Sequence, residues 1–194
     1  MNILATLALS TCAFSLAACG GGTTDAAVST PSPSPTAAPT PSLQVSCPPS
    51  SGAGGDNVAT RAFYVLVNAF TASHLSEVDL DLDLDATTAG PFTITLSAFQ
   101  GGFNGALIGT ATATPTLATS PNYSLTKFVF SGNPSVTPDG IIAFTMTINS
   151  GTGSVFFDTG TTNSSCPMNE TNGSTGTLDT TRAAGAPGAL IYGY

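Results

Sequence analysis

The chain has no tryptophan, only one histidine (His74) and only three basic residues among its 194. Charged residues make up 7% of the sequence, well below the usual quarter, so long solvated helices are not expected. The net charge of −8 excludes nucleic acid as a partner, because phosphate binding needs clustered lysine and arginine. Abundant threonine, serine, glycine and alanine are instead typical of secreted, β-rich proteins.

The scarcity of histidine also limits the chemistry that the chain can perform. His74 lies beside Ser73, Ser76 and Glu77, which would suit a nucleophile and its base. The chain has no G-x-S-x-G motif, however. One histidine does not make a zinc site with Cys47 and Cys166 either, because these cysteines are expected to be oxidised. We therefore predict that the protein is not an enzyme. The alternative, a small secreted hydrolase, requires His74 near a serine or a carboxylate in a cleft.

Residues 1–18 are apolar and small, and the run is too short for a comfortable transmembrane helix. They are typical of a signal peptide, although they lack the usual lysine or arginine. Leu16-Ala17-Ala18-Cys19 resembles the lipobox of bacterial lipoproteins. The resemblance implies cleavage before Cys19, lipidation of its thiol, and anchoring in the cell envelope, with the outer membrane favoured. An ordinary signal peptide with a chance cysteine is the alternative.

Residues 19–42 begin with the cysteine of the lipobox and continue as a segment rich in proline, serine and threonine. Such a segment cannot bury a core, and we predict an extended linker. Twenty residues of this kind reach about 60 Å at ~3.1 Å each, far enough to hold a domain clear of a membrane. The folded domain is then expected over residues 43–194.

Two cysteines, Cys47 and Cys166, lie at the two edges of this domain. In an exported protein they are expected to form a disulfide that closes a loop of about 120 residues. Two free thiols are the alternative.

Residues 78–85 alternate strictly between apolar and acidic side chains. In a strand, the valine and leucines share one face, and Asp79, Asp81, Asp83 and Asp85 share the other. We predict a strand with one face in the core and one in water. The favoured interpretation of the aspartates is a solvated face that blocks edge-to-edge aggregation. The alternative is a Ca²⁺ site, because Ca²⁺ prefers oxygen ligands. No other cofactor is expected.

About eight short strands, separated by glycine and proline, are predicted in the domain. The segments are residues 43–46, 60–72, 78–85, 92–99, 107–114, 122–130, 141–148, 154–158 and 188–194. A helix over residues 58–70 competes with the second of them. The overall pattern is typical of an all-β, antiparallel β-sandwich of jelly-roll type.

Residues 70–157 resemble bacterial secreted β-sandwich modules of the choice-of-anchor type. The resemblance rests on Leu96-Ser97-Ala98-Phe99-Gln100-Gly101-Gly102, on Leu107-Ile108-Gly109 and on the turn at residues 137–140. It implies a fold and transfers no functional residue.

The function predicted from these features is a membrane-anchored lipoprotein that presents a non-catalytic β-sandwich for structural, adhesive or ligand-binding purposes. The expected partners are the membrane, through the lipid, and a surface glycan or protein ligand. A carbohydrate-binding module is the alternative. It would need an exposed aromatic platform, and in the absence of tryptophan its candidate members are Tyr64, Phe99, Phe103 and Tyr123.

Overall fold

The structure is a computed structural model that describes residues 38–48, 55–59, 61–85, 89–119, 122–158, 166–172 and 187–194. All of these belong to one compact unit, Ala38–Tyr194. The predicted signal peptide, Cys19 and the linker up to residue 37 lie outside the described residues. Within the described ranges, no helix has the length and apolar character needed to cross a membrane.

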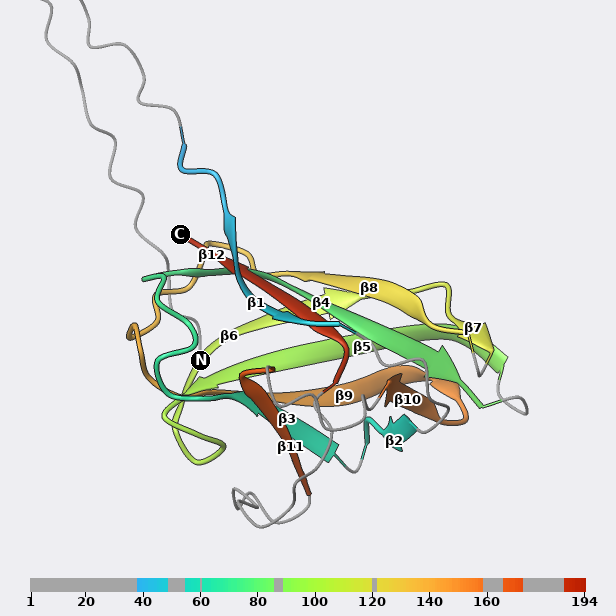
Figure 1. Ribbon diagram of the computed structural model, residues 1–194. Helices are drawn as coiled ribbons and strands as arrows, with labels where there is room; N and C mark the ends of the chain where they lie inside the picture. Colours follow the sequence, from blue (N-terminus) through green and yellow to red (C-terminus); the bar gives the residue numbers. More distant parts are fainter. Residues whose placement is uncertain are drawn as a thin grey trace, which may run out of the picture. The chain divides into compact units, whose positions relative to one another are not determined.

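The described residues form twelve strands in two sheets packed against each other, so the predicted antiparallel β-sandwich is confirmed (Figure 1). The seven-stranded sheet contains β1 (Ser42–Cys47), β12 (Ala189–Gly193), β4 (Leu75–Leu84), β10 (Val155–Asp158) and β2 (Gly55–Asn57), with β7 (Ala118–Thr119) and β8 (Ser124–Val129) also paired to β4. The five-stranded sheet has the order β11 (Met168–Asn172), β3 (Arg61–Val65), β9 (Ile142–Thr152), β5 (Ala89–Gln100) and β6 (Ala106–Ala113). The described pairs are antiparallel except β4 with β7.

Three of these strands, β2, β7 and β11, lie outside the segments that the sequence predicts. They are short and polar, and they form because a neighbouring strand supplies hydrogen bonds rather than because their residues favour it. The strand predicted over residues 60–72 is too long, since β3 ends at Val65. A turn follows, in which Asn68 has a φ of 66° and the carbonyl of Leu66 accepts from the amide of Ala69. Asparagine adopts this left-handed conformation more readily than most residues.

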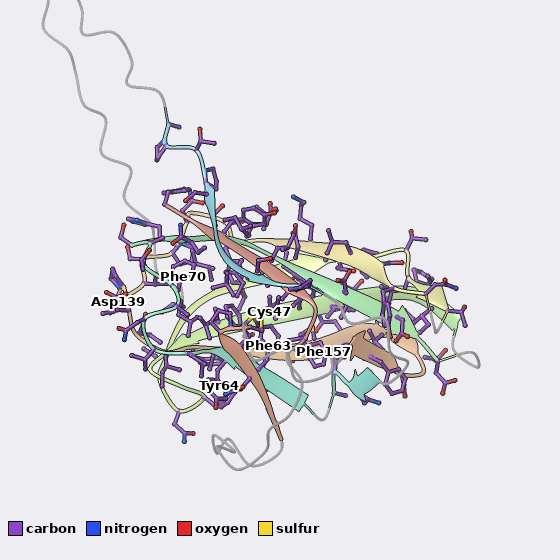
Figure 2. All side chains as sticks on the ribbon, viewed as in Figure 1. Cys47, Phe63, Tyr64, Phe70, Asp139 and Phe157 are labelled. Carbon is purple, nitrogen blue, oxygen red and sulfur yellow. A yellow bond between two sulfur atoms is a disulfide. The ribbon has the colours of Figure 1, made fainter. Side chains whose placement is uncertain are left out.

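Alternating side chains fill the space between the sheets. On β5, for example, Phe92, Ile94 and Leu96 are buried, whereas Thr95 and Ser97, on either side of Leu96, lie on the outer face. Phe63 of β3 is completely buried; its ring stacks on Phe144 and meets Phe157 edge-on, and it belongs to the same core as Cys47 (Figure 2). The core therefore draws aromatic side chains from both sheets.

The predicted disulfide between Cys47 and Cys166 is present, and the alternative of two free thiols is wrong. Cys47 ends β1, at one edge of the seven-stranded sheet, and Cys166 precedes β11, at one edge of the five-stranded sheet. The bond therefore ties the two sheets together at this side. Elsewhere, strands β6 and β8 of the two sheets contact each other.

Candidate functional site

The aspartate strand β4 lies inside the seven-stranded sheet rather than at its edge. Strands β12 and β10 pair with one side of β4, and β8 and β7 pair with the other, as Figure 1 shows for β12 and β8. The interpretation of the aspartates as a guard against edge-to-edge aggregation is therefore wrong. Alternation identifies the two faces of a strand, but it does not say which strands lie beside it.

The predicted division of faces on β4 is correct, because Val78, Leu80 and Leu82 are fully buried in the core. On the outer face, Glu77, Asp79, Asp81 and Asp83 form a line that we call the carboxylate column. The column is not the solvated face that the sequence predicts, since Asp79 and Asp83 are each only 3% exposed. Asp81 is half-buried, while Asp85 lies beyond the end of β4 and is exposed.

Apolar side chains from the neighbouring strands flank the carboxylate column. Residues directly opposite each other in a sheet share a face, and the register therefore places β8 and β12 side chains beside each carboxylate. Glu77 lies between Val129 and Tyr192, Asp79 between Lys127 and Leu190, Asp81 beside Leu125, and Asp83 beside Phe156; Leu43 of β1 lies beyond Tyr192. We call the column with these flanking residues the acidic–apolar face.

Three large apolar side chains of this face are exposed to solvent. Leu125 and Val129 are each 56% exposed, and Leu43 is 49% exposed. Only two other large apolar side chains in the described residues, Val67 and Leu107, are exposed to this degree. A gathering of exposed apolar residues beside polar ones is typical of an interaction surface.

The electrostatics of the face are those of partly desolvated carboxylates. Burial and the neighbouring Glu77 carboxylate together raise the pKa of Asp79 to about 6, although Lys127 opposes the rise. Burial also raises the pKa of Asp81. Lys127 forms an ion pair with Glu77, and Oδ1 of Asp79 is buried without a hydrogen-bond partner among the described residues. The fold therefore keeps more negative charge here than it neutralises.

The calcium hypothesis for Asp79, Asp81, Asp83 and Asp85 stays a prediction. Across the described residues, no three histidine, cysteine, aspartate or glutamate side chains gather closely enough to hold a metal ion. Carboxylates two residues apart on a strand are separated by about 7 Å, so they do not converge on one ion without additional ligands.

A second cluster lies on the outer face of the five-stranded sheet, where the register aligns Asn169, Tyr64, Phe99 and Leu107 across the strands. The ring of Phe103, from the β5–β6 turn, meets the Tyr64 ring edge-on, with ring centroids 6.5 Å apart and an angle of 88°. Tyr64 also accepts a hydrogen bond from Asn169 and is only 4% exposed (Figure 2). The Tyr64 ring is therefore packed away rather than presented as the open platform that a carbohydrate-binding module needs.

The last aromatic candidate for that platform, Tyr123, precedes β8 in the other sheet. The fold thus brings together three of the four platform candidates, Tyr64, Phe99 and Phe103. The Tyr64 and Phe103 rings are nearly perpendicular, however, so they do not form a flat surface.

His74 lies just before β4 and contacts Ser73 and Tyr194. Its Nδ1 lies 2.9 Å from Oγ of Ser73, its ring stacks on Tyr194, and its backbone exchanges two hydrogen bonds with Tyr194. Oγ of Ser73 also donates to the carbonyl of Tyr194. These contacts fix the start of β4 against the end of β12, which gives the serine–histidine pair a structural role.

Two clefts adjoin the segment between β6 and β7. The larger, of about 390 Å³, is lined by apolar residues that include Leu84, Pro91, Phe92 and Leu117. The smaller, of about 280 Å³, is lined mainly by threonines and by two residues of the acidic–apolar face, Leu125 and Lys127. Neither cleft contains His74. The smaller cleft extends the acidic–apolar face around the side of β8.

Fold and face together define an all-β sandwich with a candidate docking surface on one sheet. The chain matches no known protein family model and no curated protein. The sequence does not predict that the flanking residues lie beside the carboxylates. The alternation of residues 124–129 does place Leu125, Lys127 and Val129 on one side of a strand.

Proposed function

We propose that the protein is a lipid-anchored component of the bacterial cell envelope whose β-sandwich is a non-catalytic binding module. Cys19 carries the lipid, residues 19–42 act as the tether, and the acidic–apolar face binds the ligand. The observation that carries the binding role is the carboxylate column between exposed apolar side chains.

The contrast between the two outer sheet faces supports this assignment. The five-stranded sheet has hydroxyl groups over part of its outer face, such as Thr95, Thr112 and Thr147, and Thr95 bonds with Thr112. That face also exposes Leu107, but none of its described carboxylates is buried. The acidic–apolar face combines exposed leucine and valine with buried carboxylates, both of which are unfavourable in the isolated chain. Local violations of folding rules of this kind are expected where a protein binds something.

Lipid anchoring is tested with the full-length chain expressed in a bacterium that is fed labelled palmitate. We expect label in the wild-type protein, complete loss of label in Cys19→Ser, and release of that variant from the membrane fraction. Cys12→Ser is the matched control, because Cys12 is removed with the signal peptide and the variant should be labelled normally. Palmitate labelling of Cys19→Ser at the wild-type level would contradict the proposal.

A further inference from the structure

We propose that the acidic–apolar face binds an extended protein segment that carries lysine or arginine at every second position and lies along β4. The inference rests on the proposed function, since it names the class of partner for the same face.

The carboxylates of β4 have the spacing of alternate side chains in an extended chain. Asp79, Asp81 and Asp83 follow one another at every second residue of β4, so they repeat at about 7 Å. An extended chain places its own alternate side chains at the same repeat, so that three successive cationic groups of a partner would each lie above one carboxylate. The match is specific to an extended chain with alternating residues and not to positive charge alone.

The apolar flank of the face suits the side chains of a basic partner. Lysine and arginine carry aliphatic stems that cover apolar surface while the charged end group reaches a polar partner. Leu125 and Val129 lie directly beside the carboxylate column and expose more than half of their surface. A basic side chain that reaches Asp81 would pack its stem on Leu125, and one that reaches the Glu77 end of the column would pack on Val129.

Asp79 also carries one carboxylate oxygen that the described residues leave without a hydrogen-bond partner. Its Oδ1 is buried and accepts no hydrogen bond from the described residues. A buried acceptor without a donor is costly to the fold. Lys127, which lies opposite Asp79 on β8, is already bound to Glu77. A cationic group that another chain holds above Asp79 would offset the negative charge of this carboxylate.

Other occupants fit the face less well. A second copy of this chain would bring another net charge of −8 and another carboxylate column, so the two faces would repel each other. A divalent cation lacks a converging ligand group in the described residues. Net negative charge in turn favours encounter with a cationic chain.

The test uses the full-length protein in detergent and two labelled hexapeptides, each with three lysines and three valines. One peptide alternates the two residues and the other has the three lysines in a block. Binding is followed by fluorescence anisotropy at one salt concentration, since ionic interactions weaken with salt. We expect the alternating peptide to bind roughly tenfold more tightly, because only it can align three charges with the column.

Two pairs of variants locate the site. Asp81→Asn should weaken binding of the alternating peptide about tenfold, whereas Asp139→Asn, which removes the same charge from an exposed turn, should leave it unchanged. Leu125→Ser should weaken it roughly fivefold. Leu107→Ser, at an equally exposed leucine of the other sheet, should have no effect.

Equal affinity for the two peptides, or equal losses in a variant and its control, would overturn the inference. Absence of peptide binding alongside normal palmitate labelling at Cys19 would overturn it as well, while leaving the proposed anchoring intact. Loss of palmitate labelling with intact peptide binding would overturn the proposed anchoring and support the peptide inference.

Discussion

Replacing Cys47 and Cys166 together by alanine should lower the free energy of unfolding by about 4–5 kcal/mol. The two cysteines are 119 residues apart in the sequence, so their bond restricts a large part of the unfolded chain. In the folded state it joins edge strands of different sheets, where no backbone ladder connects them. The melting temperature should fall by roughly 10–18 °C, as expected for a domain of this size.

The measurement is thermal and urea unfolding of the oxidised wild-type protein and of the double variant. Reductant provides the control, because it should destabilise the wild-type protein to the level of the double variant and leave the double variant unchanged. A loss of less than about 1 kcal/mol would mean that the bond contributes little beyond the packing around it.

Phe63→Ala should lower the free energy of unfolding by about 3–5 kcal/mol. The Phe63 ring is completely buried and touches Phe144 and Phe157, which come from different sheets. The substitution removes two aromatic contacts worth about 0.5–1.5 kcal/mol each and leaves a cavity between the sheets.

Urea unfolding measures this effect, with Leu107→Ala as the matched control. Leu107 is an exposed apolar residue of the same sheet, so its removal should change stability by less than about 0.5 kcal/mol. Similar losses in the two variants would show that Phe63 does not hold the sheets together.

The sequence predicts the parts of this structure that depend on neighbouring residues. Alternation over residues 78–85 identifies β4 and assigns its leucines to the core and its aspartates to the other face. The oxidising compartment implied by the N-terminus predicts the disulfide, which the structure contains. Both inferences need only local periodicity or composition.

Long-range pairing accounts for the predictions that are wrong. Asp79 is buried because β8, about fifty residues later, and β12, at the C-terminal end, lie beside β4. The sequence of residues 78–85 does not indicate that β8 and β12 pair with this strand. The same limit hides the acidic–apolar face, since Leu43, Leu125 and Tyr192 come from three separate parts of the sequence and meet only through the register.

We expect the acidic–apolar face to keep a buried negative charge at the expense of stability. The pKa of Asp79 is raised from an ordinary 3.8 to about 6, so the native state binds this proton more tightly than the unfolded chain does. Stability should therefore decline as the pH rises from about 4 through 6, and the penalty should be complete above that range. The charges around Asp79 are Glu77 and Asp81 on β4 and Lys127 on β8.

The most direct test is the free energy of unfolding of Asp79→Asn and of the wild-type protein between pH 4 and pH 7.5. Asparagine cannot ionise, so the variant should be more stable than the wild-type protein at pH 7.5 by about 1–3 kcal/mol, and the difference should shrink toward pH 4. Asp139→Asn, at an exposed turn, should show no such trend. A variant that is less stable than the wild-type protein at pH 7.5 would contradict the account, because it would mean that the Asp79 carboxylate serves the fold itself.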